Sequence, residues 1–153
     1  MTITITTDAS FMPSYNIGAY AFWISTPIGK HTDARVFNNP VNSSHDAEFK
    51  CIINALYRVK ALKLNVEIIY INTDSLICIR SIKNNKATKW CEATLPMYNA
   101  IVKQLSAKIV LRHVKAHEHT KTKRNWVNQW CDDNAKRLAK AKVNQIKFGE
   151  VNK

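Results

Sequence analysis

The 153 residues are enough for one domain that buries roughly 70% of its unfolded surface, and an apolar content of 46% excludes a wholly disordered chain. Lys and Arg number 23 against 11 acidic residues, so the net charge of +12 predicts a polyanionic partner, nucleic acid before a membrane surface, although a merely soluble basic protein remains an alternative. No apolar run approaches the roughly 18 residues of a membrane span and no signal-peptide pattern is visible, so we expect no membrane partner.

Strands are predicted for the first part of the chain. β-branched residues alternate over residues 2–8, and two more β-rich runs cover residues 18–26 and 29–38. Pro27 and Gly29 mark a hairpin-like turn between the second and third runs. The period then changes to that of a helix over residues 42–62, with Ser43 or Ser44 as its N-cap.

The rest of the chain alternates strands and helices. The predicted elements are a strand buried on both faces at 66–73, helices at 75–83 and 91–105, a strand at 108–114 and an amphipathic helix at 126–142. This order predicts an α/β fold with a five-stranded mixed sheet, in which a three-strand antiparallel meander is extended by two parallel strands and flanked by helices. We expect one domain over residues 1–142 and a frayed basic C-terminal tail over 143–153.

The four cysteines at positions 51, 78, 91 and 131 form no Cys-x-x-Cys pair. Cys51 and Cys78 lie in apolar periodic runs. This pattern favours buried reduced thiols in a cytoplasmic protein over a disulfide framework.

Four acidic residues lie at positions that are expected to face the interior of the protein, where an unpaired carboxylate is costly. Asp8 and Asp74 end two predicted strands, at the sheet edge where ligands of such folds bind. Glu48 continues the apolar stripe of the first long helix, and Asp132 lies near the start of the last helix on the face that carries its small residues. Both side chains are therefore expected to point at the sheet. Asp133 is rotated by about 100° around the helix axis from Asp132. A helix-start acid favoured by the helix dipole is the more common explanation for Glu48 alone. Together, four inward carboxylates would bind a hard divalent cation such as Mg²⁺.

These acids lie in motifs that together resemble ribonuclease H of type 1, also found as the C-terminal domain of reverse transcriptases. The motifs are, in order, TITTDAS, SSHDAEFKCIINAL, INTDS, HVKAH and NQWCDDNAKRLA, and the likeness covers roughly residues 2–142. Each motif alone is weak, but five in this order on a matching series of strands and helices are specific.

The resemblance implies an endoribonuclease that hydrolyses the RNA strand of RNA–DNA hybrids by a two-metal-ion mechanism and leaves 5′-phosphate and 3′-hydroxyl ends. The residues implied as ligands of two Mg²⁺ ions, which Mn²⁺ would replace, are Asp8, Glu48, Asp74 and Asp132. His117 takes the place of the mobile histidine that assists the reaction. We expect a monomer.

The resemblance also implies a nucleic-acid surface. Ser10, Ser44 and His45 stand where the family contacts the 2′-hydroxyl groups of RNA. The basic handle of some bacterial members is reduced to KNNKATKW, where Lys86, Lys89 and Trp90 would supply phosphate and stacking contacts. Lys121, Lys123 and Arg124 lie in a long stretch between His117 and Asp132. A solvated charge run is an equal alternative for the stretch KNNKATKW.

Parts of the sequence suggest three other functions. His113, His117 and His119 suggest zinc, but their spacing across a strand end and the lack of a nearby cysteine argue against it. A module that binds nucleic acid without cutting it is opposed by the presence of all four carboxylates. A DNA-directed nuclease of the same superfamily stays open because the RNA-contacting segments differ: Ala9 replaces the family's glycine, and FMPSYN replaces its glycine-rich loop.

Overall fold

The computed structural model describes residues 1–114 and 123–151, with the backbone alone for residues 123, 124 and 151. Its strands are β1 (Thr2–Met12), β2 (Ile17–Thr26), β3 (Gly29–Val36), β4 (Ile68–Thr73) and β5 (Lys108–His113). Its helices are α1 (Ser44–Ala61), α2 (Leu76–Asn84), α3 (Thr94–Leu105) and α4 (Lys123–Val151), with short 3-10 turns η1 (Pro13–Tyr15) and η2 (Lys89–Cys91).

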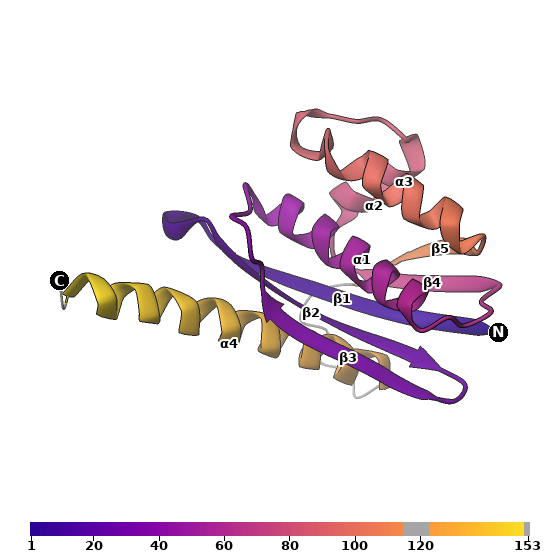
Figure 1. Cartoon of the computed structure of the whole chain (residues 1–153), viewed down its shortest axis with the longest axis horizontal. Coiled ribbons are helices and arrows are strands. Elements are labelled where there is room, and N and C mark those ends of the chain that lie inside the picture. The colour runs from indigo at the N-terminus through magenta and orange to yellow at the C-terminus, as the bar shows by residue number, and fades with distance from the viewer. Residues whose placement is uncertain (115–122, 152–153) are drawn as a thin grey trace.

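The five strands form one mixed sheet in the order β3-β2-β1-β4-β5. The pairs β1–β2 and β2–β3 are antiparallel, and the pairs β1–β4 and β4–β5 are parallel. Helices α1 and α3 lie over one face of the sheet and α4 lies under the other, as Figure 1 shows. The predicted α/β fold is therefore confirmed.

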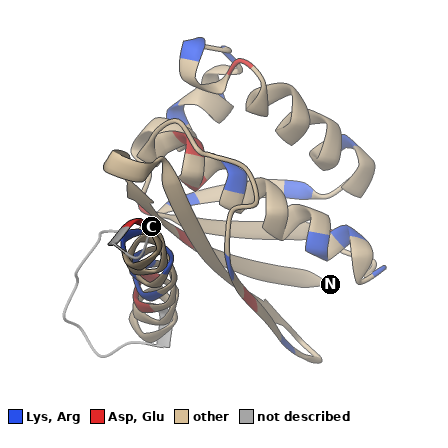
Figure 2. Cartoon of the chain, turned by 60° about the vertical axis from the view of Figure 1, so that its left-hand side comes forward, with Lys and Arg blue, Asp and Glu red and all other residues tan. Residues whose placement is uncertain are grey.

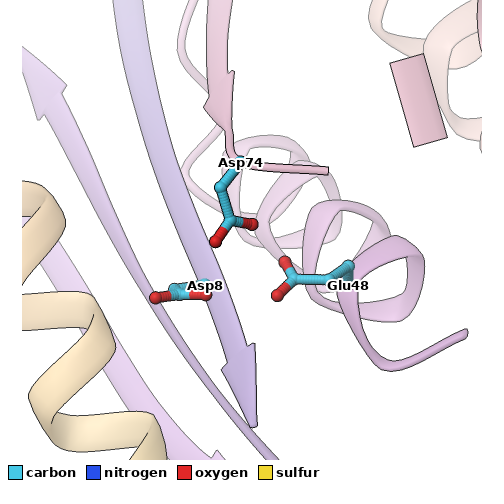
Figure 3. A group of neighbouring side chains, drawn as sticks. All are labelled: Asp8, Glu48 and Asp74. Atoms are coloured by element: carbon cyan, nitrogen blue, oxygen red, sulfur yellow. The ribbon is translucent and has the colours of Figure 1, made fainter. Parts of the chain in front are cut away.

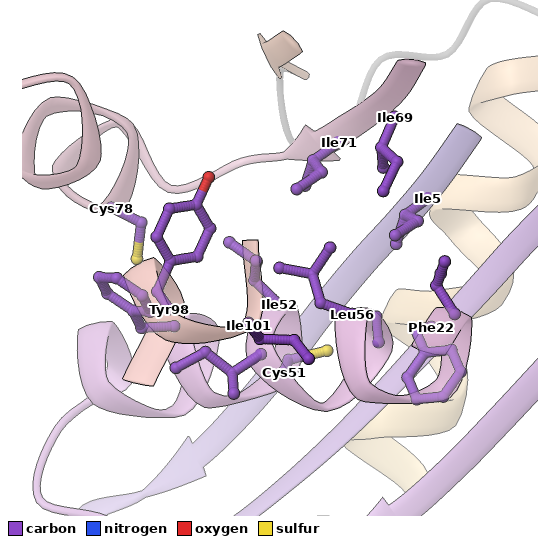
Figure 4. Packing of buried hydrophobic residues seen from close by; sticks show 14 of the residues in the cluster. Ile5, Phe22, Cys51, Ile52, Leu56, Ile69, Ile71, Cys78, Tyr98 and Ile101 are labelled. Carbon is purple, nitrogen blue, oxygen red and sulfur yellow. The ribbon is translucent and has the colours of Figure 1, made fainter. Parts of the chain in front are cut away.

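Period-two alternation divides the sheet between two apolar cores. Ile5, Phe22 and Ile71 face α1, where they pack in the larger cluster with Ile52 and Leu56 (Figure 4). On the opposite face a smaller cluster joins Ala21 and Trp23 of β2 to Val127, Cys131 and Ala135 of α4. The small side chains on both sides of this second interface allow α4 to approach the central strands closely.

The first strand is longer than the predicted 2–8. Its antiparallel pairing with β2 continues to the pair Met12↔Ile17, whereas its parallel pairing with β4 ends at Thr6↔Asn72. The turn η1 and the left-handed conformation of Asn16, with φ 51°, connect the long strands tightly in place of an open loop. Asp8 consequently lies inside β1, two residues beyond its last parallel pair, and not at the strand end as predicted.

The last helix is also longer than the predicted 126–142. It begins at Lys123 and continues to Val151, so Asp132 lies in its third turn and not near its start. Residues 143–151 are helical and Val143 is only 4% exposed, so the expectation of a frayed tail is wrong for this segment. The proposed domain limit at residue 142 stays a prediction. Within the described residues, no helix has the length and apolar character needed to cross a membrane.

Candidate active site

Three of the predicted acidic residues converge beside the central strand. Asp8 comes from β1, Asp74 from the residue after β4, and Glu48 from the first turns of α1. One carboxylate oxygen from each lies within 4.8 Å of the others, and Figure 3 shows the three side chains directed toward one another. We call Asp8, Glu48 and Asp74 the carboxylate trio.

A single backbone amide fixes two members of the trio. The N–H group of Ala9 donates to Asp8 Oδ1 at 2.9 Å and to Glu48 Oε1 at 3.1 Å. Because these two oxygens are held by the same donor, the strand and the helix are joined at the site. The second oxygen of Glu48 has no hydrogen-bond partner among the described residues, although Glu48 is only 8% exposed.

Helix caps place Glu48 and Asp74. Ser43 is the N-cap of α1 and accepts a hydrogen bond from the Asp46 N–H at 3.0 Å, while the Asp46 carboxylate accepts from the Asn42 N–H. Ser75 caps α2 in the same way through the Cys78 N–H, immediately after Asp74. The N-terminal ends of α1 and α2 are therefore fixed close to Glu48 and Asp74.

Burial and mutual repulsion disfavour the ionised forms of Asp8 and Glu48. Burial, with a further contribution from the charge of Asp74, raises the pKa of Asp8 from 3.8 to about 8. Burial and the charge of Asp8 likewise raise the pKa of Glu48 well above its ordinary value. A buried carboxylate oxygen that has no hydrogen-bond partner and lies close to other carboxylates is costly unless a cation binds. The donor set is all oxygen, which fits Mg²⁺ or Mn²⁺ better than a softer metal.

The fourth predicted ligand lies beside the trio. Asp132 of α4 is close enough to Asp8 for its charge to contribute to the raised pKa of Asp8. It forms an ion pair with Lys136 Nζ at 2.9 Å, and this hydrogen bond raises the pKa of Lys136. Asp133 is exposed and accepts a hydrogen bond from Gln129 Nε2 instead, so its predicted separation from the site agrees with the structure.

Two segments predicted to contact nucleic acid lie side by side. The ring of His45, at the start of α1, is 5.8 Å from that of Trp90, and Trp90 is also 5.8 Å from Phe49. Ser44 and the nearby Lys86 and Lys89 are exposed, whereas Ser10 is half-buried in β1. Lys and Arg residues recur around the α2–α3 connection and along α4 (Figure 2).

Several predicted residues fall outside the described part of the chain. His117, His119 and Lys121 lie in the segment 115–122, so the assisting histidine stays a prediction and the zinc alternative stays untested. Lys123 and Arg124 form the first turn of α4, and only their backbone is described. His113 is exposed at the end of β5, with Nε2 at 3.3 Å from the carbonyl oxygen of Asp74.

Two thiols contact the backbone of the strands beside the site, a placement that was not predicted. Cys51 Sγ lies 3.6 Å from the carbonyl oxygen of Asp8 and 3.4 Å from that of Ala21, and Cys131 Sγ lies 3.6 Å from that of Thr6. In the sequence they could have been found only by their closeness to predicted site residues, since Cys51 follows Glu48 by one helical turn and Cys131 precedes Asp132. All four cysteines are buried and free, as predicted.

A mixed sheet in this strand order, with acidic side chains gathered beside its central strand, is the ribonuclease-H-like class of fold. The model of the family described as RNase H matches residues 1–140, so the chain belongs to the ribonuclease H family, whose members are hydrolases. A comparison with curated protein sequences finds no match.

Solved structures agree on the fold. The N-terminal RNase H domain of a Mycobacterium tuberculosis protein is similar with a TM-score of 0.75 at 13% identity, over 95% of this chain and 98% of that one. LC11-RNase H1 in complex with an RNA/DNA hybrid gives 0.73 at 14% identity, over 92% and 99%. RNase H1 from Halobacterium salinarum gives 0.71 at 12% identity, over 90% and 97%.

Proposed function

We propose that this ribonuclease H hydrolyses the RNA strand of RNA–DNA hybrids by a two-metal-ion mechanism, with 5′-phosphate and 3′-hydroxyl products. The observation that carries the proposal is the carboxylate trio, in which the buried Glu48 Oε2 has no partner among the described residues. Family membership supports the reaction class. The similar fold of LC11-RNase H1, solved with an RNA/DNA hybrid, supports the substrate.

Asp8, Glu48 and Asp74, with Asp132 beside them, would hold the cations. Two Mg²⁺ ions, or Mn²⁺ in their place, would supply activation of the attacking water and stabilisation of the leaving 3′-oxygen. The Ala9 amide holds one oxygen of Asp8 and one of Glu48, which leaves the other oxygens available for cations. Asp8 must lose its proton before it can serve as a ligand, because its pKa is raised to about 8. His117 would assist the reaction.

The nucleic-acid surface would begin at the same place. Ser10, Ser44 and His45 would contact 2′-hydroxyl groups of the RNA strand. Lys86, Lys89 and Trp90 would contact phosphates and bases further along the hybrid, and the contact between His45 and Trp90 supports one continuous surface. Lys121, Lys123 and Arg124 would add phosphate contacts.

A cleavage assay with end-labelled substrates tests the proposal. We expect Mg²⁺-dependent cutting of the RNA strand of a hybrid, no cutting of double-stranded RNA or DNA, and full loss of activity with a chelator. Cutting of DNA would favour the DNA-directed nuclease, and tight binding without cutting would favour the non-catalytic module. Ligation of the products to a 3′-hydroxyl acceptor checks for the 5′-phosphate.

Replacing Trp90 by Ala should weaken hybrid binding by about 1–3 kcal/mol, the usual value of one aromatic stacking contact. Because Trp90 also packs on Phe49, the unfolding free energy must be measured beside the affinity. Trp90→Phe keeps an aromatic face and should retain most of the affinity. An unchanged affinity in Trp90→Ala, measured by fluorescence anisotropy, would contradict a stacking role.

We further propose a monomer in the reducing cytoplasm. The four buried free thiols support that compartment, since a disulfide framework is absent from the described residues.

A further inference from the structure

A row of polar side chains crosses three neighbouring strands beneath the active site. Thr6↔Asn72 is the last pair between β1 and β4, and Asn72↔Arg112 is the adjacent pair between β4 and β5. Asn72 Nδ2 donates to Thr6 Oγ1 at 3.3 Å, and Arg112 Nε donates to Asn72 Oδ1 at 2.8 Å. We call Thr6, Asn72 and Arg112 the polar row.

This row is unusual for the strands that carry it. Asn72 is 1% exposed and Thr6 is 4% exposed, whereas their neighbours Ile5 and Ile71 fill the opposite face with apolar atoms. Central parallel strands are usually apolar on both faces. Buried amide and hydroxyl groups are costly to desolvate, and even when hydrogen-bonded they add little net stability over aliphatic side chains of similar size. Stability alone therefore gives no reason for this row.

Its position supplies a reason. Thr6 precedes Asp8 by two residues within β1, so the two side chains share a strand face. Asn72 precedes Asp74 by two residues, and Asp74 is the first residue after β4. Beyond the Thr6↔Asn72 pair the described residues show no further parallel pairing between β1 and β4. The Thr7 hydroxyl also donates to the Asn72 carbonyl oxygen at 3.4 Å. This bond and the polar row therefore hold the two strands together just before the two acids.

The ends of the row are anchored as well. The Arg112 guanidinium lies over the ring of Tyr70, with 4.3 Å between its central carbon and the ring centroid. At the other end, the Thr6 carbonyl oxygen lies 3.6 Å from Cys131 Sγ, next to Asp132 on α4. The row therefore connects the elements that carry Asp8, Asp74 and Asp132.

We propose that Thr6, Asn72 and Arg112 are positioning residues that hold the ends of β1 and β4 at the separation the cation site requires. The inference rests on the proposed function of the carboxylate trio. When Asp8 and Asp74 are both ionised, their repulsion acts to separate the two strands, and the row opposes it. Groups that hydrogen-bond to metal ligands typically change metal affinity by about 10–100-fold when they are removed. The polar row acts through the strands that carry the ligands, so its effect should lie at the low end of this range.

Asn72→Leu tests the proposal, because leucine has a similar volume and makes neither hydrogen bond. We expect the Mn²⁺ affinity of the hybrid-free protein, measured by titration calorimetry, to fall by about tenfold, the low end of that range. The Mg²⁺ concentration for half-maximal cleavage should rise by a similar factor. Thr6→Val should act in the same direction, whereas Thr6→Ser keeps the hydroxyl group and should retain near wild-type Mn²⁺ affinity.

Arg58→Met is the matched control for Arg112→Met. Arg58 is also a half-buried arginine near an aromatic ring and is paired with Asp33 at 3.2 Å, but it lies ten residues after Glu48, about 15 Å along α1. Arg112→Met should weaken Mn²⁺ binding, and Arg58→Met should lower only the unfolding free energy. Wild-type Mn²⁺ affinity in Asn72→Leu and Thr6→Val, or a loss of affinity that follows stability equally in Arg58→Met, would overturn the inference. Failure of the wild-type protein to bind Mn²⁺ would instead overturn the proposed function.

Discussion

Asp8→Asn should lower the rate of hybrid cleavage by at least about a thousandfold while the variant still binds the hybrid. Asparagine keeps the shape of the side chain but removes the negative charge that would hold a cation. A bound metal contributes several kcal/mol of charge stabilisation to the transition state, and about 4 kcal/mol corresponds to a thousandfold in rate. Asp74→Asn should behave alike, because both residues belong to the carboxylate trio.

Single-turnover cleavage of a labelled hybrid in Mg²⁺ measures the rate, and fluorescence anisotropy measures binding. Binding should be unchanged or tighter, since one repulsion toward the phosphates is lost. Asp133→Asn is the control, because Asp133 is exposed beside Asp132 and accepts a hydrogen bond from Gln129 outside the trio. Near wild-type cleavage by both Asp8→Asn and Asp74→Asn would contradict the assignment of the trio as metal ligands.

The order and type of the elements could be predicted because periodicity reports burial directly. Ile52 and Leu56 recur at helical spacing and do pack against the sheet, and the run before Asp74 is the buried strand β4. The lengths of β1 and α4 could not be predicted in the same way. Their ends depend on partners that are distant in sequence, since Met12 is held in β1 by Ile17 and Val143 is buried beyond the expected end of α4.

The site shows the same division. Asp8, Glu48 and Asp74 could be predicted because Asp8 and Asp74 follow β-rich runs and Glu48 continues the apolar stripe of a helix. The amide of Ala9, the thiol of Cys51 and the polar row could not be predicted, because no sequence pattern shows which groups meet across neighbouring strands and helices. Only the register of β1 with β4 and α1 reveals that these groups meet beneath the acids.

The metal-free protein should lose stability as the pH rises from about 6 to about 8. Asp8 has a pKa of about 8 in the folded protein against an ordinary value of 3.8, so the folded form binds this proton more tightly than the unfolded form. The contribution to stability is fully present below the unfolded pKa and is lost as the pH rises through the folded pKa. Between the unfolded and the folded pKa, one such group lowers the unfolding free energy by up to about 1.4 kcal/mol for each unit that the pH rises. The raised pKa of Glu48 acts in the same direction.

Urea denaturation in chelator at pH 6 and pH 8 measures this loss, and Asp8→Asn is its control. The variant has no carboxyl proton to lose at this position, so its stability should depend less on pH and should exceed that of the wild type at pH 8. Mg²⁺ should stabilise the wild type more at pH 8 than at pH 6, because a cation competes with the Asp8 proton. A pH-independent wild type, or an Asp8→Asn variant less stable than the wild type at pH 8 in chelator, would contradict the raised pKa of Asp8. If the variant is the more stable protein and the inactive one, the buried acids are kept for cation binding at the expense of the metal-free fold.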